Sequence, residues 1–147
     1  MSQNMITQST TTVLVLDDEP NIRESLAEYL MDCGFAILTA ESAEDALMLP
    51  GLGDVSVAVV DIRLGGIDGL EFIKRLHALH PSVRCLIHTG STDFQLDKEL
   101  RAIGMTEREV LFKPVLDMGF SRLSSWRRSR RAGHESGQDV RGPDHRR

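Results

Sequence analysis

The sequence predicts an α/β protein in which helices cover both faces of a single parallel sheet. Five short apolar runs of strand length alternate strictly with segments whose apolar residues recur at helical spacing. These connecting segments are long enough to cross over the sheet, and strands joined in this way lie parallel, with right-handed connections. A chain of 147 residues with 41% apolar content also has enough material for one domain with its own core.

The first apolar run predicts a buried strand followed by a helix. Residues 13–16 read VLVL and end at the acidic pair Asp17 and Asp18, a pattern typical of a strand covered on both faces. Pro20 suits the first turn of a helix, apolar residues then recur at helical spacing, and Gly34 supplies the stop.

The second and third strands are expected at residues 35–40 and 55–60. Between them, Ser42 and Asp45 form a capping-box pair that opens a short helix, and a Pro-Gly pair closes it. The third strand, VSVAVV, is the most apolar of the five and ends at Asp61.

The remaining elements continue the alternation. A helix over residues 70–80 leads to a strand at residues 83–87. A helix over residues 94–103, capped by Ser91, then leads to a short strand at residues 110–112. Alternation of this kind is typical of a doubly wound parallel sheet.

Charged and hydroxyl side chains follow four of the predicted strands, namely Asp17 and Asp18, Asp61, Thr89 and Lys113. The carboxyl ends of parallel strands meet at one edge of the sheet, where ligands of such folds bind. Two carboxylates about 4 Å apart repel by roughly 4 kcal/mol at an effective dielectric of about 20, so a cation is the expected compensation. Oxygen-only ligands favour a hard cation such as Mg²⁺.

These residues suit the transfer of a phosphoryl group to a carboxylate. Carboxylates are known covalent acceptors, and phosphoryl transfer requires mainly positioning and neutralisation of charge. Asp18 and Asp61 would bind Mg²⁺, while Asp17 would bind it through water or hold Asp18 in place. The ammonium of Lys113 and the hydroxyl of Thr89 would then contact oxygens of the transferred group.

Four motifs occur in the order and near the spacing of one known family: DDEP at 17–20, DIRLGGIDG at 61–69, HTGS at 88–91 and FKP at 112–114. Through them the chain resembles the response-regulator receiver domain of bacterial two-component signalling, over roughly residues 12–123. The resemblance implies a flavodoxin-like, doubly wound sheet of five parallel strands in the order 2-1-3-4-5.

The resemblance also implies a role for each site residue. Asp61 would be the phosphoacceptor, served by a sensor histidine kinase or a histidine phosphotransfer protein. Thr89 would be the switch hydroxyl, and Lys113 would contact the phosphoryl group. The implied Mg²⁺ ligands are Asp17, Asp18, Asp61 and the backbone carbonyl of Arg63. Such a protein is a switch that catalyses only its own phosphorylation and dephosphorylation, and signals through binding to a downstream protein, not identified by the sequence, or through onward phosphorelay.

Two positions depart from the pattern of the family. Gly65 replaces a usual proline, so the loop after Asp61 is expected to be less rigid. Val110 replaces a usual Tyr or Phe that moves with the switch threonine, so coupling from Thr89 to the surface is expected to be weaker or to use another side chain.

Two alternatives remain open at this point. The first is a receiver-like docking module that binds its partner without phosphorylation. The second is an aspartate-nucleophile phosphatase of the haloacid-dehalogenase type. That family places a second Asp two residues after its nucleophile on the first motif strand, whereas here Glu19 stands two residues after Asp17.

No zinc site is expected from the cysteines and histidines. Cys33 and Cys85 are isolated in the sequence and are interpreted as buried free thiols. His77, His80 and His88 have no second metal-binding pair beside them and are expected at the surface.

The expected organisation is a disordered segment at 1–11, a receiver domain at 12–126 that includes a last helix, and an Arg-rich tail at 127–147. The tail holds seven Arg and three acidic residues, and its composition predicts disorder without a DNA-binding domain. No apolar run approaches the roughly 18 residues of a membrane span, so a cytoplasmic protein is expected.

Overall fold

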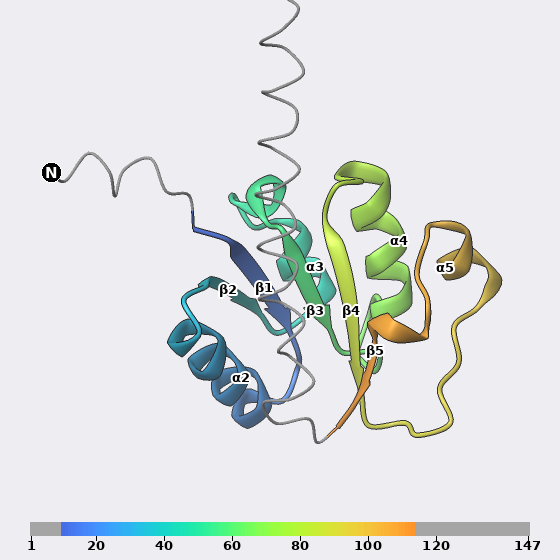
Figure 1. Ribbon diagram of the computed structural model, residues 1–147, viewed down its shortest axis with the longest axis horizontal. Helices are drawn as coiled ribbons and strands as arrows, with labels where there is room; N and C mark the ends of the chain where they lie inside the picture. The colour runs from blue at the N-terminus through green and yellow to red at the C-terminus, as the bar shows by residue number, and fades with distance from the viewer. Residues whose placement is uncertain (1–9, 114–147) are drawn as a thin grey trace, which may run out of the picture. The chain divides into compact units, whose positions relative to one another are not determined.

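The structure is a computed structural model that describes residues 10–113. Within this range, five strands form one parallel sheet in the order β2-β1-β3-β4-β5 (Figure 1). The strands are β1 (Thr12–Leu16), β2 (Ala36–Ala40), β3 (Val57–Val60), β4 (Arg84–Thr89) and β5 (Val110–Phe112). The predicted α/β class, the parallel directions and the strand order are confirmed. The expected N-terminal segment up to residue 9, the last helix and the Arg-rich tail lie outside the described residues.

Helices lie on both faces of the sheet. They are α2 (Pro20–Asp32), α3 (Ala43–Leu47), α4 (Gly69–Leu79) and α5 (Lys98–Ala102). α2 packs against β1 and β2 (Figure 1). Leu14 and Leu16 of β1 join the apolar cluster of α3, α4 and α5, whereas Val13 and Val15 are buried outside this cluster. Because side chains alternate along a strand, these two pairs face opposite sides of the sheet.

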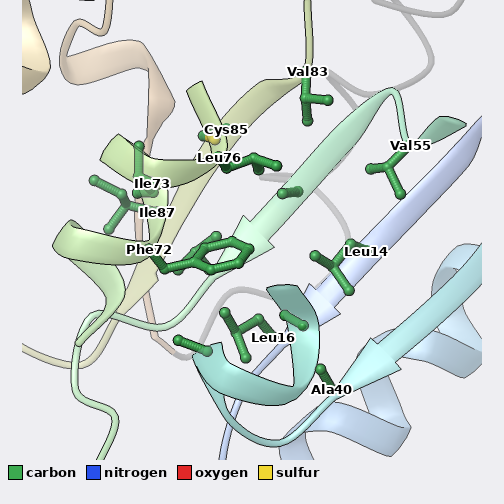
Figure 2. Close-up of a cluster of buried hydrophobic side chains, with 14 of the residues drawn as sticks. Leu14, Leu16, Ala40, Val55, Phe72, Ile73, Leu76, Val83, Cys85 and Ile87 are labelled. Atoms are coloured by element: carbon green, nitrogen blue, oxygen red, sulfur yellow. The ribbon is translucent and has the colours of Figure 1, made fainter. Parts of the chain in front are cut away.

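The apolar cluster between the sheet and α4 positions the loop that follows β3. Phe72, Ile73 and Leu76 of α4 are fully buried against side chains from β1, β3 and β4 (Figure 2). Full burial of an apolar side chain of this size contributes roughly 1.5–3 kcal/mol. The first turn of α4 is therefore firmly anchored beside the carboxyl ends of the strands.

The predicted starts of two helices agree with the structure. Pro20 stands at the first position of α2, and the helix ends at Asp32, shortly before Gly34 with its φ of 101°. The Ser42 side chain caps α3 by accepting a hydrogen bond from the backbone N–H of Asp45 at 3.1 Å. Local capping signals were sufficient to predict both starts.

The predicted helix over residues 94–103 is wrong in its start and in its cap. α5 begins only at Lys98, because the Asp97 side chain accepts a hydrogen bond from the Leu100 N–H at 2.9 Å. Ser91 belongs to a turn next to β4, where its N–H donates to the Thr89 hydroxyl at 3.1 Å. Serine and aspartate are both favoured N-caps, and the aspartate is the one used.

Two short 3-10 helices were not predicted. The first (Leu52–Asp54) precedes β3, which therefore begins at Val57 and not at residue 55. The second (Glu107–Glu109) is held by a capping box between Thr106 and Glu109 and leads directly into β5. No helix within residues 10–113 is long and apolar enough to cross a membrane.

Candidate functional site

Three acidic side chains meet at the carboxyl edge of the sheet. Leu16 of β1 pairs with Val60 of β3, so the residues that follow, Asp17 and Asp61, lie at the same level on neighbouring strands. Oxygen atoms of Asp17, Asp18 and Asp61 all lie within 4.8 Å of one another. Asp17 is 2% exposed and Asp61 5% exposed, whereas Asp18 faces solvent. The structure therefore brings together the acidic residues that the sequence analysis selected.

Lys113 reaches this acidic cluster from the end of β5. Its backbone N–H continues the ladder of β5 by donating to the Thr89 carbonyl at 2.7 Å. Its Nζ lies 3.1 Å from Asp17 Oδ2 and 3.5 Å from Asp61 Oδ2. Glu19 Oε1 is also 3.5 Å from this Nζ, and this glutamate is more exposed to solvent. One cation thus interacts with two buried carboxylates.

The electrostatics of the cluster are only partly balanced by Lys113. Burial, and then the charge of Asp17, raise the pKa of the Asp61 carboxyl, while Lys113 lowers it by a smaller amount. Burial alone would lower the pKa of the Lys113 ammonium, but the hydrogen bond to Asp17 and the charges of Asp17 and Asp61 outweigh burial and raise it. Lys113 is therefore protonated at neutral pH, and the cluster favours a further positive charge.

These features fit a bound Mg²⁺ ion. The cluster offers only carboxylate oxygens, and one of its three acids, Asp18, is open to solvent, where waters can complete an octahedral shell. An open pocket of about 760 Å³ adjoins the cluster. Its lining residues are Asp18, Glu19, Asp61, Arg63, Gly90, Ser91, Thr92, Asp93 and Lys113. There is thus room beside Asp61 for a phosphoryl group and part of its donor.

Two backbone N–H groups close the ends of the loop after Asp61. The Arg63 N–H donates to Asp61 Oδ1 at 3.2 Å, and the Gly69 N–H donates to the Ile62 carbonyl at 3.1 Å. A Cβ atom on Gly69 would lie 2.2 Å from the Asp61 carbonyl oxygen, so only glycine fits at this position. The predicted glycine-rich loop therefore contains one glycine with a direct packing role beside the site.

Thr89 lies at the carboxyl end of β4, next to Lys113. It is fully buried, and its hydroxyl accepts the hydrogen bond from the Ser91 N–H described above. A Cβ on the following residue, Gly90, would meet no atom within 4 Å, so the space above the strand end stays open.

Three residues near the site were missed or misplaced by the sequence analysis. The Glu19 N–H donates to Asp17 Oδ1 at 3.0 Å, and a guanidinium nitrogen of Arg23 donates to the Asp17 carbonyl at 2.8 Å. His88, expected at the surface, is 4% exposed, and burial together with the charge of Lys113 lowers its pKa to about 4. The apolar residues that precede His88 in β4 are the sequence signal from which its burial could have been predicted.

A doubly wound parallel sheet with a buried acidic cluster and a lysine at its carboxyl edge defines a class of phosphoryl-binding signalling domains. The family model of the response regulator receiver domain matches residues 13–119, and the chain belongs to this family. The identification favours the receiver over the phosphatase alternative. Receiver domains are phosphorylated on an aspartate by histidine kinases and bind Mg²⁺ at an acidic pocket.

Two curated relatives illustrate the range of proteins that carry this domain. The chain is 33% identical over 104 residues to a cyclic di-GMP phosphodiesterase of Thermotoga maritima, covering 71% of this chain and 27% of the relative. It is 35% identical over 106 residues to the transcriptional regulatory protein FixJ of Bradyrhizobium diazoefficiens, covering 71% of this chain and 50% of the relative. The chain thus matches at most half the length of these relatives.

Solved structures of the response regulator TrrA are similar to this chain. The Mg²⁺-BeF complex of TrrA from Thermotoga maritima has a TM-score of 0.66 at 30% identity, over 82% of this chain and 98% of that one. TrrA in complex with the histidine kinase ThkA has a TM-score of 0.67 at 30% identity, over 79% and 97% of the two chains.

Proposed function

We propose that this protein accepts a phosphoryl group on Asp61 from the phosphohistidine of a sensor kinase or of a histidine phosphotransfer protein. One observation carries the proposal: the Asp61 carboxylate belongs to the acidic cluster, lies 3.5 Å from the ammonium of Lys113, and lines an open pocket. The complex of TrrA with a histidine kinase supports the kind of donor.

The reaction requires that Asp61 is ionised when the donor arrives. A carboxylate oxygen of Asp61 attacks the phosphorus, a P–O bond forms, and the P–N bond of the donor breaks. The electron pair of that bond goes to the imidazole nitrogen, which is protonated as it leaves. Burial and the charge of Asp17 raise the pKa of the Asp61 carboxyl and so favour its protonated form. The positive charge of Lys113 opposes this effect and helps to keep Asp61 ionised.

Mg²⁺ would be held by the carboxylates of Asp17, Asp18 and Asp61, with the Arg63 carbonyl as a further ligand. When bound, it supplies positive charge to the oxygens of the transferring group. Lys113 would contact one of these oxygens. Glu19 and Arg23 hold the Asp17 side chain and backbone in place while the ligands assemble.

The new acyl phosphate would carry more negative charge than the carboxylate it replaces. The Thr89 hydroxyl now accepts a hydrogen bond from the Ser91 N–H. After phosphorylation it would give up this bond and donate a hydrogen bond to a phosphoryl oxygen. This rearrangement would change the surface at β4 and β5 and control binding to another protein or onward phosphorelay. The role as a switch and not as an enzyme with its own substrate, and the expected cytoplasmic location, remain predictions.

The test is phosphorylation by a cognate kinase or a small acyl phosphate, with and without Mg²⁺. Wild type should be labelled only with Mg²⁺, and Asp61→Asn should remain unlabelled. Asp32→Asn removes one exposed carboxylate at the far end of α2 and should be labelled as wild type is. Equal labelling of wild type and Asp61→Asn would refute the assignment.

A second candidate function is a docking module that works without phosphorylation. Val110 favours it: this half-buried side chain packs against the core in β5, at a position where the family pattern has an aromatic ring. Without that ring, movement of Thr89 has less effect on the outer surface of β5.

A further inference from the structure

The loop after Asp61 is closed at its ends by two hydrogen bonds, and the side chains of Leu64 and Ile67 between them pack, half-buried, against the core. The hydrogen bonds of Arg63 to Asp61 and of Gly69 to Ile62 close those ends. Between them stands Gly65, which takes the place of the family's proline, and a Cβ added there would meet no atom within 4 Å. A contact from another element would add a restraint on the backbone at this part of the loop.

Glu44 makes that contact from the first turn of α3. Its Oε2 accepts a hydrogen bond from the Ile67 backbone N–H at 3.0 Å, across 23 residues of sequence. The carboxylate also lies over Gly66, which has a φ of +69°, and a Cβ there would come within 2.5 Å of Oε2. Gly66 therefore both adopts a left-handed conformation and leaves room for the Glu44 carboxylate.

The helix that carries Glu44 is a firm base. Ala43 and Ala46 on either side are fully buried, and Ser42 caps the helix. The hydrogen bond from Ile67 is the main cause that lowers the pKa of the Glu44 carboxyl, so this group is ionised at neutral pH and acts only as an acceptor.

We propose that Glu44 is a positioning residue of the phosphoacceptor site. By holding the middle of loop 62–68 it keeps the Arg63 backbone in place beside Asp61, and so sets the affinity of the site for Mg²⁺. The link to Mg²⁺ rests on the proposed function, whereas the contact between Glu44 and the loop does not. Glu44 itself touches no reacting atom.

Three variants of the full chain separate this role from a loss of charge or of fold. Glu44→Ala removes the acceptor, and Glu44→Gln keeps an acceptor oxygen but loses the charge. Glu41→Ala removes another exposed carboxylate just before the same helix. The measurements are amide hydrogen exchange at Ile67, the Mg²⁺ dissociation constant by NMR titration, and the dependence of acyl-phosphate labelling on Mg²⁺ concentration.

Glu44→Ala should speed exchange at Ile67 and weaken Mg²⁺ binding, each by roughly threefold to tenfold, the effect of one hydrogen bond of ordinary net strength. The labelling rate at saturating Mg²⁺ should stay near that of wild type. In Glu44→Gln and Glu41→Ala, the exchange rate at Ile67 and the Mg²⁺ dissociation constant should both remain within about twofold of wild type. Each of these variants retains an acceptor for the Ile67 N–H.

Unchanged exchange at Ile67 in Glu44→Ala, or an equal effect of Glu41→Ala, would overturn the proposal. So would faster exchange at Ile67 with unchanged Mg²⁺ affinity. Failure of the proposed function gives a different result: wild type would then neither bind Mg²⁺ nor become labelled, while Ile67 would still exchange faster in Glu44→Ala.

Discussion

At the scale of single residues, the site places a charged group where folding disfavours it. The Asp61 carboxylate is 5% exposed and close to a second buried acid, Asp17, with Lys113 as the shared partner. Its raised pKa means that the folded state binds a proton at Asp61 more readily than the unfolded chain does. The ionised carboxylate therefore costs stability, and the role proposed for Asp61 as a nucleophile would account for a carboxylate at this position.

Asp61→Asn should therefore stabilise the protein at neutral pH without Mg²⁺. A gain of about 1 kcal/mol corresponds to a rise of roughly 4–8 °C in Tm for a domain of this size. For a carboxyl with a raised pKa, the cost is absent below the unfolded pKa and complete above the folded pKa. The difference between the two proteins should accordingly shrink as pH falls through the raised pKa of Asp61.

Thermal melts at several pH values, with Asp32→Asn as the control, measure this effect. Mg²⁺ should raise the Tm of wild type more than that of Asp61→Asn, because it binds the folded state through the missing carboxylate. A lower Tm for Asp61→Asn at neutral pH would contradict the account of the cluster.

The sequence could predict which residues form the site, but not all of their neighbours. Asp17, Asp61 and Lys113 follow apolar runs, and strand ends converge in any parallel sheet. The bond from Ile67 to Glu44 joins segments 23 residues apart, and its geometry depends on how α3 and the loop pack. Such a contact leaves no local pattern in the sequence.

At the scale of elements, the junction between β3 and α4 decides where Asp61 lies. α4 begins at Gly69 with Asp68 as its cap, and the Asp68 side chain accepts a hydrogen bond from the Glu71 N–H at 2.8 Å. The backbone of Gly69 passes directly against the Asp61 carbonyl. Because α4 is held by the core, this close approach fixes the strand end that carries Asp61.

Gly69→Ala should destabilise the protein by about 1–3 kcal/mol, because the new Cβ would overlap backbone that cannot move without a shift of α4. Gly65→Ala is the matched control in the same loop, with open space around it and no positive φ. That variant should be neutral or stabilising by roughly 0.4–1 kcal/mol through the unfolded chain. Urea denaturation of both variants measures the difference, and equal stabilities would contradict the packing role of Gly69.

Strands and helices differed in how well the sequence predicted them. All five predicted strands exist, because each is a short, mainly apolar segment between turn residues. The start of α5 was wrong because Ser91 and Asp97 are both suitable caps, and only the packing of the segment after β4 decides between them. Ser91 is engaged instead by Thr89, a contact that depends on the site.

At the scale of the whole molecule, a change at the site has to alter the surface that a partner protein would bind. Thr89 and Lys113 connect the site to β4 and β5, since the Lys113 N–H donates to the Thr89 carbonyl. Phe112, the last residue of β5 and the one before Lys113, is 39% exposed. The FixJ relative and the phosphodiesterase relative extend well beyond the matched region, and their activities belong to the whole proteins. The output of this receiver therefore has to be measured directly.

Beryllofluoride with Mg²⁺ should change amide chemical shifts at Thr89 and along β5, since an acyl-phosphate mimic offers the hydroxyl a new acceptor. The Asp61→Asn variant should show none of these changes. Shift changes confined to the acidic cluster, with partner affinity unaltered, would instead favour the docking module suggested by Val110.

Mapping the phosphorylated residue tests the assignment of Asp61 most directly. Wild type is treated with a small acyl phosphate as donor in the presence of Mg²⁺. The aspartyl phosphate formed on the protein is then reduced with borohydride, and peptides are sequenced by mass spectrometry. We expect modification at Asp61, lost in Asp61→Asn and when Mg²⁺ is removed. Modification at another residue, or none under conditions that label a known receiver, would contradict the assignment.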